Sequence, residues 1–226
     1  LYRMVCKFSN VLKKLGIKKG DRVGIYLPMI PEVLVAMLAC ARIGAIHSVV
    51  FSAFSGSNFK KRVDDCEAKV LITCDGYWRR GKQINLKKQA DTAAKAKSVK
   101  KMVVVKRFKD SKVSMKKGRD LWYHDLMEKA SEDSKPVPVE ANTPLFLLYT
   151  SGTTGKPKGV MISSAHLQAM TLTYFVDVDE VQTEDAILSA APMSHGPGIY
   201  NFMHVLRGRR HVVPESGGFV PVEILA

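Results

Sequence analysis

The sequence predicts an α/β fold in which a mostly parallel β-sheet is covered by layers of helices. Short apolar runs such as 45–51 and 69–74 do not alternate with polar residues, which is typical of strands buried on both faces. Segments with an apolar residue every three or four positions separate these runs, as connecting helices do. The chain has 226 residues and is 46% hydrophobic, which excludes a disordered or collagen-like protein and supplies a sizeable core.

The first part of the chain alternates helices and strands. Apolar positions from Met4 to Leu15 follow helical spacing and stop at Gly16, a typical helix terminator. The other helices that we expect cover 32–43, 58–66, 86–97 and 120–130, and the strands that we expect cover 22–27, 45–51, 69–74 and 102–106. A polar, proline-containing linker at 131–143 then indicates a boundary between a first subdomain, 1–134, and a second, 135–226.

The second part begins with a predicted strand at 145–149, which runs straight into a loop rich in Ser, Thr, Gly and Lys. The chain then resumes as a strand at 160–163 and as a helix at 165–175, for which Ser163 or Ser164 is the expected N-cap. A last predicted strand, 187–190, leads into the segment 192–198.

The net charge of +14 is concentrated in one place. Ten basic residues and one acid lie between Lys97 and Arg119, so the excess is local. Such a run more often marks a solvated surface than a binding patch. A nucleic-acid-binding module at Lys97–Arg119 is the non-enzymatic alternative, but Phe108 is the one aromatic residue in the run that could stack on a base, so we expect no nucleic-acid partner.

Cysteine spacing and hydropathy indicate the cellular compartment in which we expect the protein. Cys6, Cys40, Cys66 and Cys74 form no C-x-x-C pair, which argues against a metal site or disulfide framework and fits a cytoplasmic protein. The longest apolar run, 33–41, is too short to span a bilayer, so we expect no integral membrane association. The chain starts in an amphipathic pattern without an initiator Met, from which we expect a cut N-terminus.

Two glycine-lysine loops are candidates for binding phosphate. The first, Gly76–Lys82, has the G-x-x-x-x-G-K spacing of nucleoside triphosphatases, but Gln83 stands where a Ser or Thr would hold magnesium. Its interior, which includes Trp78, is also bulky where backbone N–H groups should wrap a phosphate. A triphosphatase built on Gly76–Lys82 is therefore the weaker enzymatic alternative.

The second loop, Thr150–Gly159, is better suited to a polyphosphate. Its hydroxyl groups can donate to phosphate oxygens, its glycines let the backbone approach closely, and its lysines supply positive charge. These residues are Thr150, Ser151, Gly152, Thr153, Thr154, Gly155, Lys156 and Lys158. Pro157 between the two lysines excludes a Walker loop, so the chemistry is of a different phosphate-binding type.

The stretch 147–160, Leu-Leu-Tyr-Thr-Ser-Gly-Thr-Thr-Gly-Lys-Pro-Lys-Gly-Val, closely resembles the phosphate-binding signature of the adenylate-forming acyl-CoA synthetase superfamily. Upstream, the segments 15–32, 36–51, 69–76 and 79–82 are similar to the acetyl-CoA synthetase branch. Downstream, 188–202 and 211–219 are more similar to medium- or long-chain fatty acid CoA ligases. The reaction class is therefore implied, while the chain length of the acid stays open.

The resemblance implies an AMP-forming acid–CoA ligase. A carboxylate attacks the α-phosphorus of ATP to give an acyl-adenylate and pyrophosphate, and the thiol of coenzyme A then displaces AMP. ATP, Mg²⁺ and coenzyme A are the implied cofactors, and a small carboxylic acid is the implied substrate. By resemblance, residues 150–156 and Lys158 bind the ATP phosphates, Thr150 and Lys158 act in catalysis, and Thr150 also lies at the metal.

Two further assignments come from the same resemblance. Arg79, Arg80 and Lys82 are expected to contact the phosphates of coenzyme A. His195 is expected to line the acyl pocket and orient the carboxylate or α-phosphate, although a core histidine at a turn is the plainer interpretation. The superfamily's later motifs are absent from these residues, so we expect an incomplete N-terminal domain, cut at both ends and inactive alone; the oligomeric state stays open.

Overall fold

The computed structural model describes residues 1–79, 81–150, 158–191, 193, 197–215 and 220–225. The first half contains α1 (Tyr2–Lys14), β1 (Arg22–Ile25), α2 (Pro31–Arg42), β2 (Ile46–Val49), α3 (Gly56–Cys66), β3 (Val70–Cys74), β4 (Tyr77–Arg79), β5 (Lys82–Ile84), α4 (Leu86–Ala93) and β6 (Lys101–Val105). The second half contains β7 (Asp120–Trp122), α5 (Tyr123–Glu128), β8 (Pro144–Thr150), β9 (Lys158–Ser163), α6 (Ser164–Asp177), β10 (Ala186–Leu188), α7 (Pro197–Leu206), β11 (Arg210–Val212) and α8 (Pro221–Leu225).

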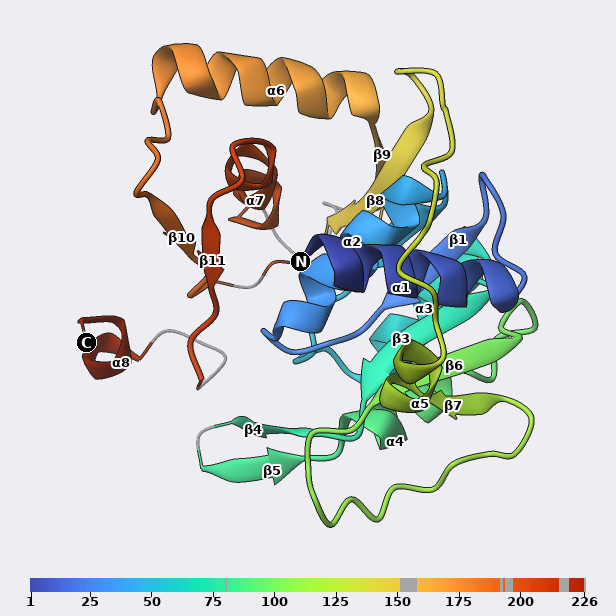
Figure 1. The fold of residues 1–226 in the computed structure, drawn as a ribbon. Helices are drawn as coiled ribbons and strands as arrows, with labels where there is room; N and C mark the ends of the chain where they lie inside the picture. Colours follow the sequence, from blue (N-terminus) through green and yellow to red (C-terminus); the bar gives the residue numbers. More distant parts are fainter. Residues whose placement is uncertain (80, 151–157, 192, 194–196, 216–219, 226) are drawn as a thin grey trace.

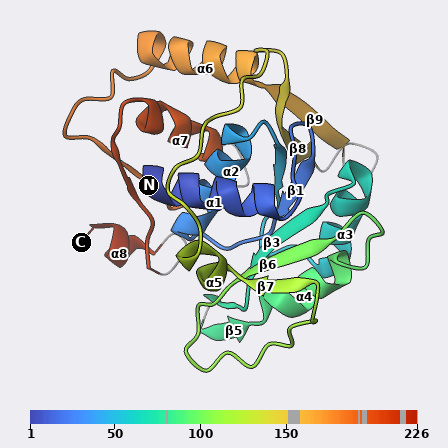
Figure 2. The same ribbon diagram turned by 45° about the vertical axis from the view of Figure 1, so that its right-hand side comes forward.

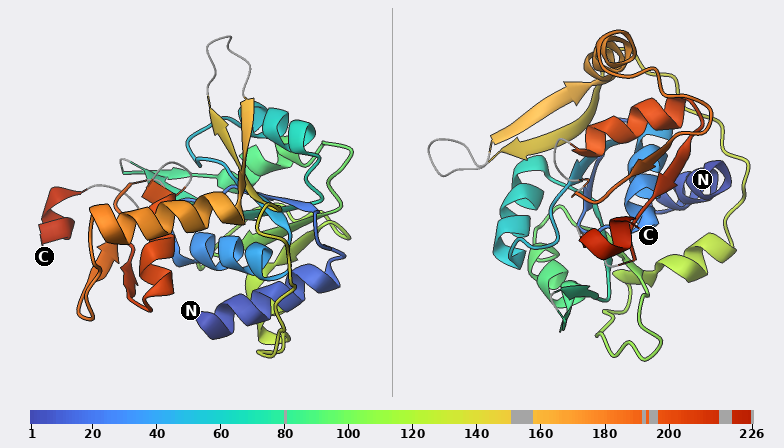
Figure 3. Two further views of the ribbon diagram at one scale, coloured as in Figure 1. Left: turned by 90° about the horizontal axis from the view of Figure 1, so that it is seen from above. Right: turned by 90° about the vertical axis from the view of Figure 1, so that its left-hand side faces the viewer.

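One seven-stranded sheet organises the molecule, with the strand order β7-β6-β3-β1-β2-β8-β9. Neighbouring strands are parallel throughout except for β8 and β9, which are antiparallel. Helices α1, α2 and α5 cover one face, and α3 and α4 cover the other (Figures 1 and 3). The predicted α/β class, a mostly parallel sheet between helical layers, is confirmed.

The core lies between the sheet and these helices. The strands β1, β3 and β6 are buried along almost their whole length, because helices cover both of their faces. Val70, Leu71 and Ile72 have no exposed surface, and burying each such side chain contributes about 1.5–3 kcal/mol. The continuous apolar runs in the sequence are thus explained by two-sided burial.

The segment predicted as one helix over 120–130 is divided in the structure. Asp120–Trp122 forms the edge strand β7, parallel to β6 with Met102 opposite Asp120, and the helix α5 begins only at Tyr123. The prediction was wrong at 120–122 because the edge of β6 supplies a partner strand with which these residues form backbone hydrogen bonds. Local spacing alone carries no information about that edge.

The segment Gly76–Lys82 is also not the loop that the triphosphatase alternative needs. It forms the start of an antiparallel hairpin in which Tyr77 pairs with Ile84 and Trp78 with Gln83. A phosphate loop of that type wraps from a strand directly into a helix. The strand β5 intervenes here, so the geometry contradicts a triphosphatase site at Gly76–Lys82.

The linker 131–143 runs along the surface of the first helical layer. Asn10 donates from Nδ2 to the carbonyl oxygens of Ser131 and Asp133, and Arg42 donates to that of Ser134. Beyond the linker, β8 joins β2 in the same sheet, with Phe146 opposite His47. The subdomain boundary at 134/135 stays a prediction.

The later elements form a smaller group beside the sheet (Figure 2). The helix α6 starts at the predicted cap, where Ser163 accepts from His166 N and the His166 ring contacts Ser163 N in return. The strands β10 and β11 pair in parallel, and α7 packs against α6.

Within the residues that the structure describes, no helix combines the length and hydropathy needed to cross a membrane. The same residues hold no group of three or more His, Cys, Asp or Glu side chains arranged to bind a metal. All four cysteines are buried and carry free thiols.

Candidate functional site

The predicted phosphate loop is held between the paired ends of β8 and β9. Thr150 ends β8 and Lys158 starts β9, and the two residues are opposite each other in the antiparallel register. Both are exposed, so the hydroxyl and the ammonium group are accessible to a ligand. The predicted contacts Ser151, Gly152, Thr153, Thr154, Gly155 and Lys156 lie outside the described residues.

The strand β8 has two faces with different surroundings. Phe146 and Leu148 line a small cavity toward α7, and the period of two puts Thr150 on the same face. Tyr149 lies on the other face, where its hydroxyl donates to Asp65 of α3. Thr150 therefore lies two residues beyond Leu148 of the cavity wall, on the same face of the strand.

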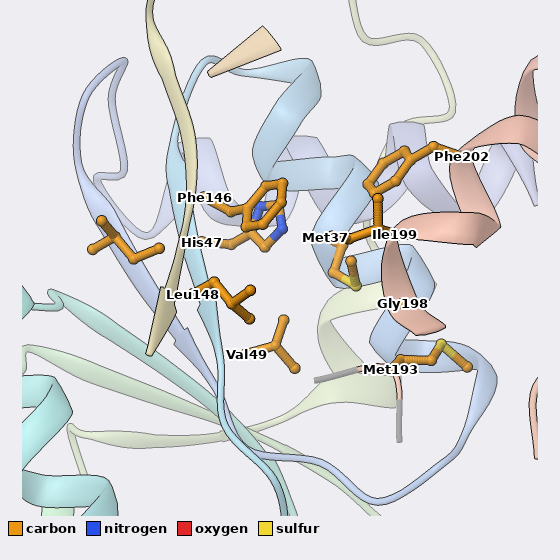
Figure 4. Close-up of a pocket in the computed structure, with 10 residues that line it drawn as sticks. Met37, His47, Val49, Phe146, Leu148, Met193, Gly198, Ile199 and Phe202 are labelled. Atoms are coloured by element: carbon orange, nitrogen blue, oxygen red, sulfur yellow. The ribbon is translucent and has the colours of Figure 1, made fainter. Parts of the chain in front are cut away.

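That cavity, of about 20 Å³, lies between β2, β8, α2 and α7. Its lining is almost wholly apolar and consists of Met37, His47, Val49, Phe146, Leu147, Leu148, Met193, Gly198, Ile199 and Phe202 (Figure 4). The volume accommodates one water-sized or methyl-sized group.

His47 is the polar exception in the cavity wall. It is 1% exposed, its ring stacks on Phe146 with centroids 5.3 Å apart, and neither ring nitrogen has a hydrogen-bond partner among the described residues. Burial lowers the pKa of His47 to about 3, so the ring is neutral at physiological pH. Sequence reasoning missed His47, since a single histidine in an apolar strand gives no signal of its own.

The predicted site residue His195 lies outside the described residues, but its neighbours meet the cavity. Met193 donates from its backbone N to Met29 Sδ at 3.2 Å, which fixes one side of the segment. Gly198 approaches the backbone of Met193 so closely that a Cβ there would clash. The role of His195 stays a prediction.

The hairpin β4–β5 carries the residues predicted to contact coenzyme A. Arg79 and Lys82 are exposed and directly opposite each other, while Arg80 between them is outside the described residues. Like charges directly opposite each other destabilise a strand pair. Tyr77 donates its hydroxyl to the Ser52 carbonyl at 3.4 Å and so ties the hairpin to the segment after β2.

The mostly parallel sheet between helical layers defines an α/β protein, with the Thr150–Lys158 stem and the basic hairpin β4–β5 as its candidate site. Residues 1–225 match the AMP-binding enzyme family, and the chain belongs to that family.

Similar curated proteins are acetyl-coenzyme A synthetases. Those of Methanothrix thermoacetophila and Desulfatibacillum aliphaticivorans are each 57% identical over 71% of this chain, and that of Bdellovibrio bacteriovorus is 50% identical over 80%. The matched regions are 24%, 25% and 28% of the respective relatives, so the chain spans about a quarter of their length.

Proposed function

We propose that this chain is part of an AMP-forming acid–CoA ligase that activates a short aliphatic acid with ATP. The observation that carries the proposal is the Thr150–Lys158 loop stem at the end of a parallel sheet in a chain of the AMP-binding enzyme family. Curated acetyl-coenzyme A synthetases at 50–57% identity support the same reaction class. The nucleic-acid alternative at Lys97–Arg119 has no comparable support.

Forming an acyl-adenylate requires stabilisation of the charge that builds up on the departing pyrophosphate. The Lys158 ammonium is proposed to neutralise the terminal phosphates, and the Thr150 hydroxyl to donate to a phosphate oxygen or contribute an oxygen to the metal. Thr150 is an exposed oxygen donor at the strand end, which suits Mg²⁺. When bound, Mg²⁺ offsets negative charge between the phosphates.

The cavity beside β8 is the proposed place for the alkyl end of the acid. Leu148 of its wall lies two residues before Thr150 on the same strand face, so a carboxylate beside Thr150 would direct its carbons toward Phe146 and Leu148. Because the volume is about 20 Å³, a methyl group suits it and a long chain does not. This favours acetate as the substrate over medium- and long-chain acids, although the segments 188–202 and 211–219 resemble fatty acid CoA ligases.

The coenzyme A contact is proposed at the tip of the hairpin β4–β5. The guanidinium of Arg79 and the ammonium of Lys82 are opposed and solvent-accessible, and a phosphate group between them would relieve their repulsion. We include Arg80 in this contact on the basis of the resemblance alone.

The test is acid-dependent exchange of labelled pyrophosphate into ATP, measured on the natural protein that contains this sequence. We expect exchange with acetate, less with butyrate and least with octanoate. Lys158→Ala should reduce exchange about a hundredfold, as expected for loss of a charge that stabilises the transition state.

The matched control is Lys117→Ala, an exposed lysine of the basic segment that should leave exchange unchanged. Release of ADP rather than AMP, or exchange that does not depend on an acid, would contradict the proposal. Preference for octanoate over acetate would contradict the assignment of the cavity but not the reaction class.

A further inference from the structure

The side chain immediately before the candidate phosphate loop is fixed to a helix on the opposite face of the sheet from the cavity. Tyr149 donates its hydroxyl to Asp65 Oδ2 at 2.5 Å, although the two residues are 84 positions apart in the chain. The ends of β8 and β9 lie beside α3 in both views of Figure 3. This hydrogen bond therefore joins the loop stem to α3.

The Tyr149 ring is also held by its neighbour across the strand pair. Gly159 lies opposite Tyr149, and a Cβ on Gly159 would be 3.1 Å from Tyr149 Cζ and 3.2 Å from Cε1. A contact of 3.0–3.4 Å is tighter than most Cβ atoms make, so any larger residue at 159 would press on the ring. The ring thus occupies the space that the glycine leaves free.

Arg62 covers the ring from the helix side. Its guanidinium carbon lies 5.6 Å from the Tyr149 ring centroid and 4.8 Å from that of Phe54, within the range of cation–π attraction. Arg62 is 7% exposed and donates from Nη1 to the Asn58 carbonyl at 2.9 Å, which holds it against its own helix. The aromatic ring is therefore enclosed by α3 and by β9.

Burial, with a smaller effect from the Asp65 hydrogen bond, raises the pKa of the Tyr149 hydroxyl. The hydroxyl therefore keeps its proton throughout the physiological range and remains a donor to the carboxylate. A hydrogen bond to a charged acceptor is stronger than one between neutral groups.

We propose that Arg62, Asp65 and Tyr149 form a clamp that sets the position of Thr150 and Lys158. The inference rests on the proposed function, since it assigns positioning residues to the same site. The clamp lets α3 orient the loop stem without contacting the nucleotide. In a loop that must stabilise charge by geometry, a small displacement of the stem lowers the rate.

The first experiment is limited trypsin digestion of this chain under native conditions, with cleavage at Lys158–Gly159 followed by mass spectrometry. Cleavage at Lys129–Ala130, after α5 and far from the clamp, provides the internal reference. Tyr149→Phe and Asp65→Ala should each raise the ratio of cleavage at Lys158–Gly159 to cleavage at Lys129–Ala130, because the hydrogen bond that holds the stem is lost. The expected rise is about three- to tenfold, since a hydrogen bond to an exposed acceptor is weaker than one to a buried acceptor.

The matched controls separate the hydrogen bond from other effects. Asp65→Asn keeps an acceptor oxygen and should give a smaller rise than Asp65→Ala. The double variant should give no greater rise than either single variant, since both remove one interaction. Tyr2→Phe, at an exposed tyrosine of α1, should leave the ratio unchanged. An unchanged ratio in Tyr149→Phe, or equal rises at both bonds, would overturn the clamp.

The second experiment measures pyrophosphate exchange by the natural protein that contains this sequence, with KM for ATP and kcat determined separately. Tyr149→Phe and Gly159→Ala, which displaces the ring while keeping every polar group, should both raise KM for ATP or lower kcat about threefold or more. If the parent lacks exchange, the proposed function fails while the digestion result still stands. If the parent exchanges and both variants match it, the clamp fails while the function stands.

Discussion

At the scale of single residues, His47 shows how the environment decides what a side chain does. The imidazole lies in a strand between apolar residues, stacked on Phe146 and without a hydrogen-bond partner in the described part of the chain. Because burial lowers its pKa to about 3, the folded protein holds it neutral over the range in which an unfolded chain binds a proton. His47 therefore makes stability depend on pH.

The direction of this pH dependence follows from the lowered pKa of His47. The contribution of His47 is complete above its ordinary pKa of 6.5 and falls by up to about 1.4 kcal/mol per pH unit as the pH drops toward 3. Between about pH 7 and about pH 5.5, the parent should lose about 1 kcal/mol more unfolding free energy than His47→Leu. Urea denaturation at both pH values measures this, and equal losses in the two proteins would contradict a neutral buried ring.

At the scale of elements, an ion-pair cluster joins α4 to the edge strand β7. Lys87 Nζ lies 2.8 Å from Asp120 Oδ2, with side chains 1% and 0% exposed, and also contacts Asp91 at 2.7 Å. Arg119 bonds to the other oxygen of Asp120. Burial opposes ionisation of Asp120, but hydrogen bonds from Arg119 and Lys87 outweigh it and hold its pKa below 3.8.

Neutralising Asp120 leaves the buried Lys87 ammonium with the partly exposed Asp91 as its remaining carboxylate partner. Asp120→Asn should lower the free energy of unfolding by about 1.5–3 kcal/mol near pH 7, because charge-assisted hydrogen bonds are lost. The double variant Lys87→Met with Asp120→Leu should restore part of that stability. The comparison is Asp64→Asn in the exposed Lys60–Asp64 pair of α3, for which we expect about 0.5 kcal/mol or less. Because Asp120 has a lowered pKa, the difference should shrink as the pH falls below about 4.

At the scale of the whole molecule, apolar surface is distributed unevenly. The helices α6 and α7 border a groove of about 460 Å³ lined by Leu167, Gln168, Thr171, Leu172, Phe202, Val205 and Leu206. Leu172 is 63% exposed and Val176 is 81% exposed, whereas the residues of β3 and β6 are buried. Contiguous exposed apolar surface of this kind attracts apolar ligands.

We expect this chain to enhance the fluorescence of the apolar dye ANS without any denaturant. The combined variant Leu172→Lys and Leu206→Lys should reduce the enhancement by about half or more, because it places two charges on the groove. Val222→Lys, an exposed position on α8, serves as the control and should change little. Equal fluorescence in the parent and the double variant would show that the dye binds elsewhere.

Much of the fold can be predicted from local patterns. The strands at 69–74 and 102–106 and the buried helix from 32 follow from uninterrupted apolar runs and helical spacing, which act over a few residues. The same holds for the stem of the phosphate loop, since Thr150 and Lys158 belong to a continuous motif. Local reasoning predicted a helix over 120–130 and was wrong at 120–122, where the pairing of Asp120 with Met102 forms a strand, while 123–128 is helical.

The basic run Lys97–Arg119 contains both exposed charges and a buried strand. Lys97–Arg119 is continuous in sequence, but Met102–Val105 inside it is a buried strand and Arg119 pairs with Asp91 and Asp120. Eight of the ten basic residues are exposed, so the run is largely a solvated surface, and the buried part is the apolar stretch Met102–Val105 of β6.

The sequence by itself determined the α/β class and the order of the elements, because hydrophobic periodicity is a local property. It also predicts the candidate phosphate loop, because the residues of that motif are contiguous. Only the tertiary structure decided the strand order, the hairpin at 77–84, the cavity beside His47 and the contact of Tyr149 with Asp65. The hairpin pairs residues that are close in sequence. The other three features depend on residues far apart in the chain, which meet only when burial of the apolar strands brings them together.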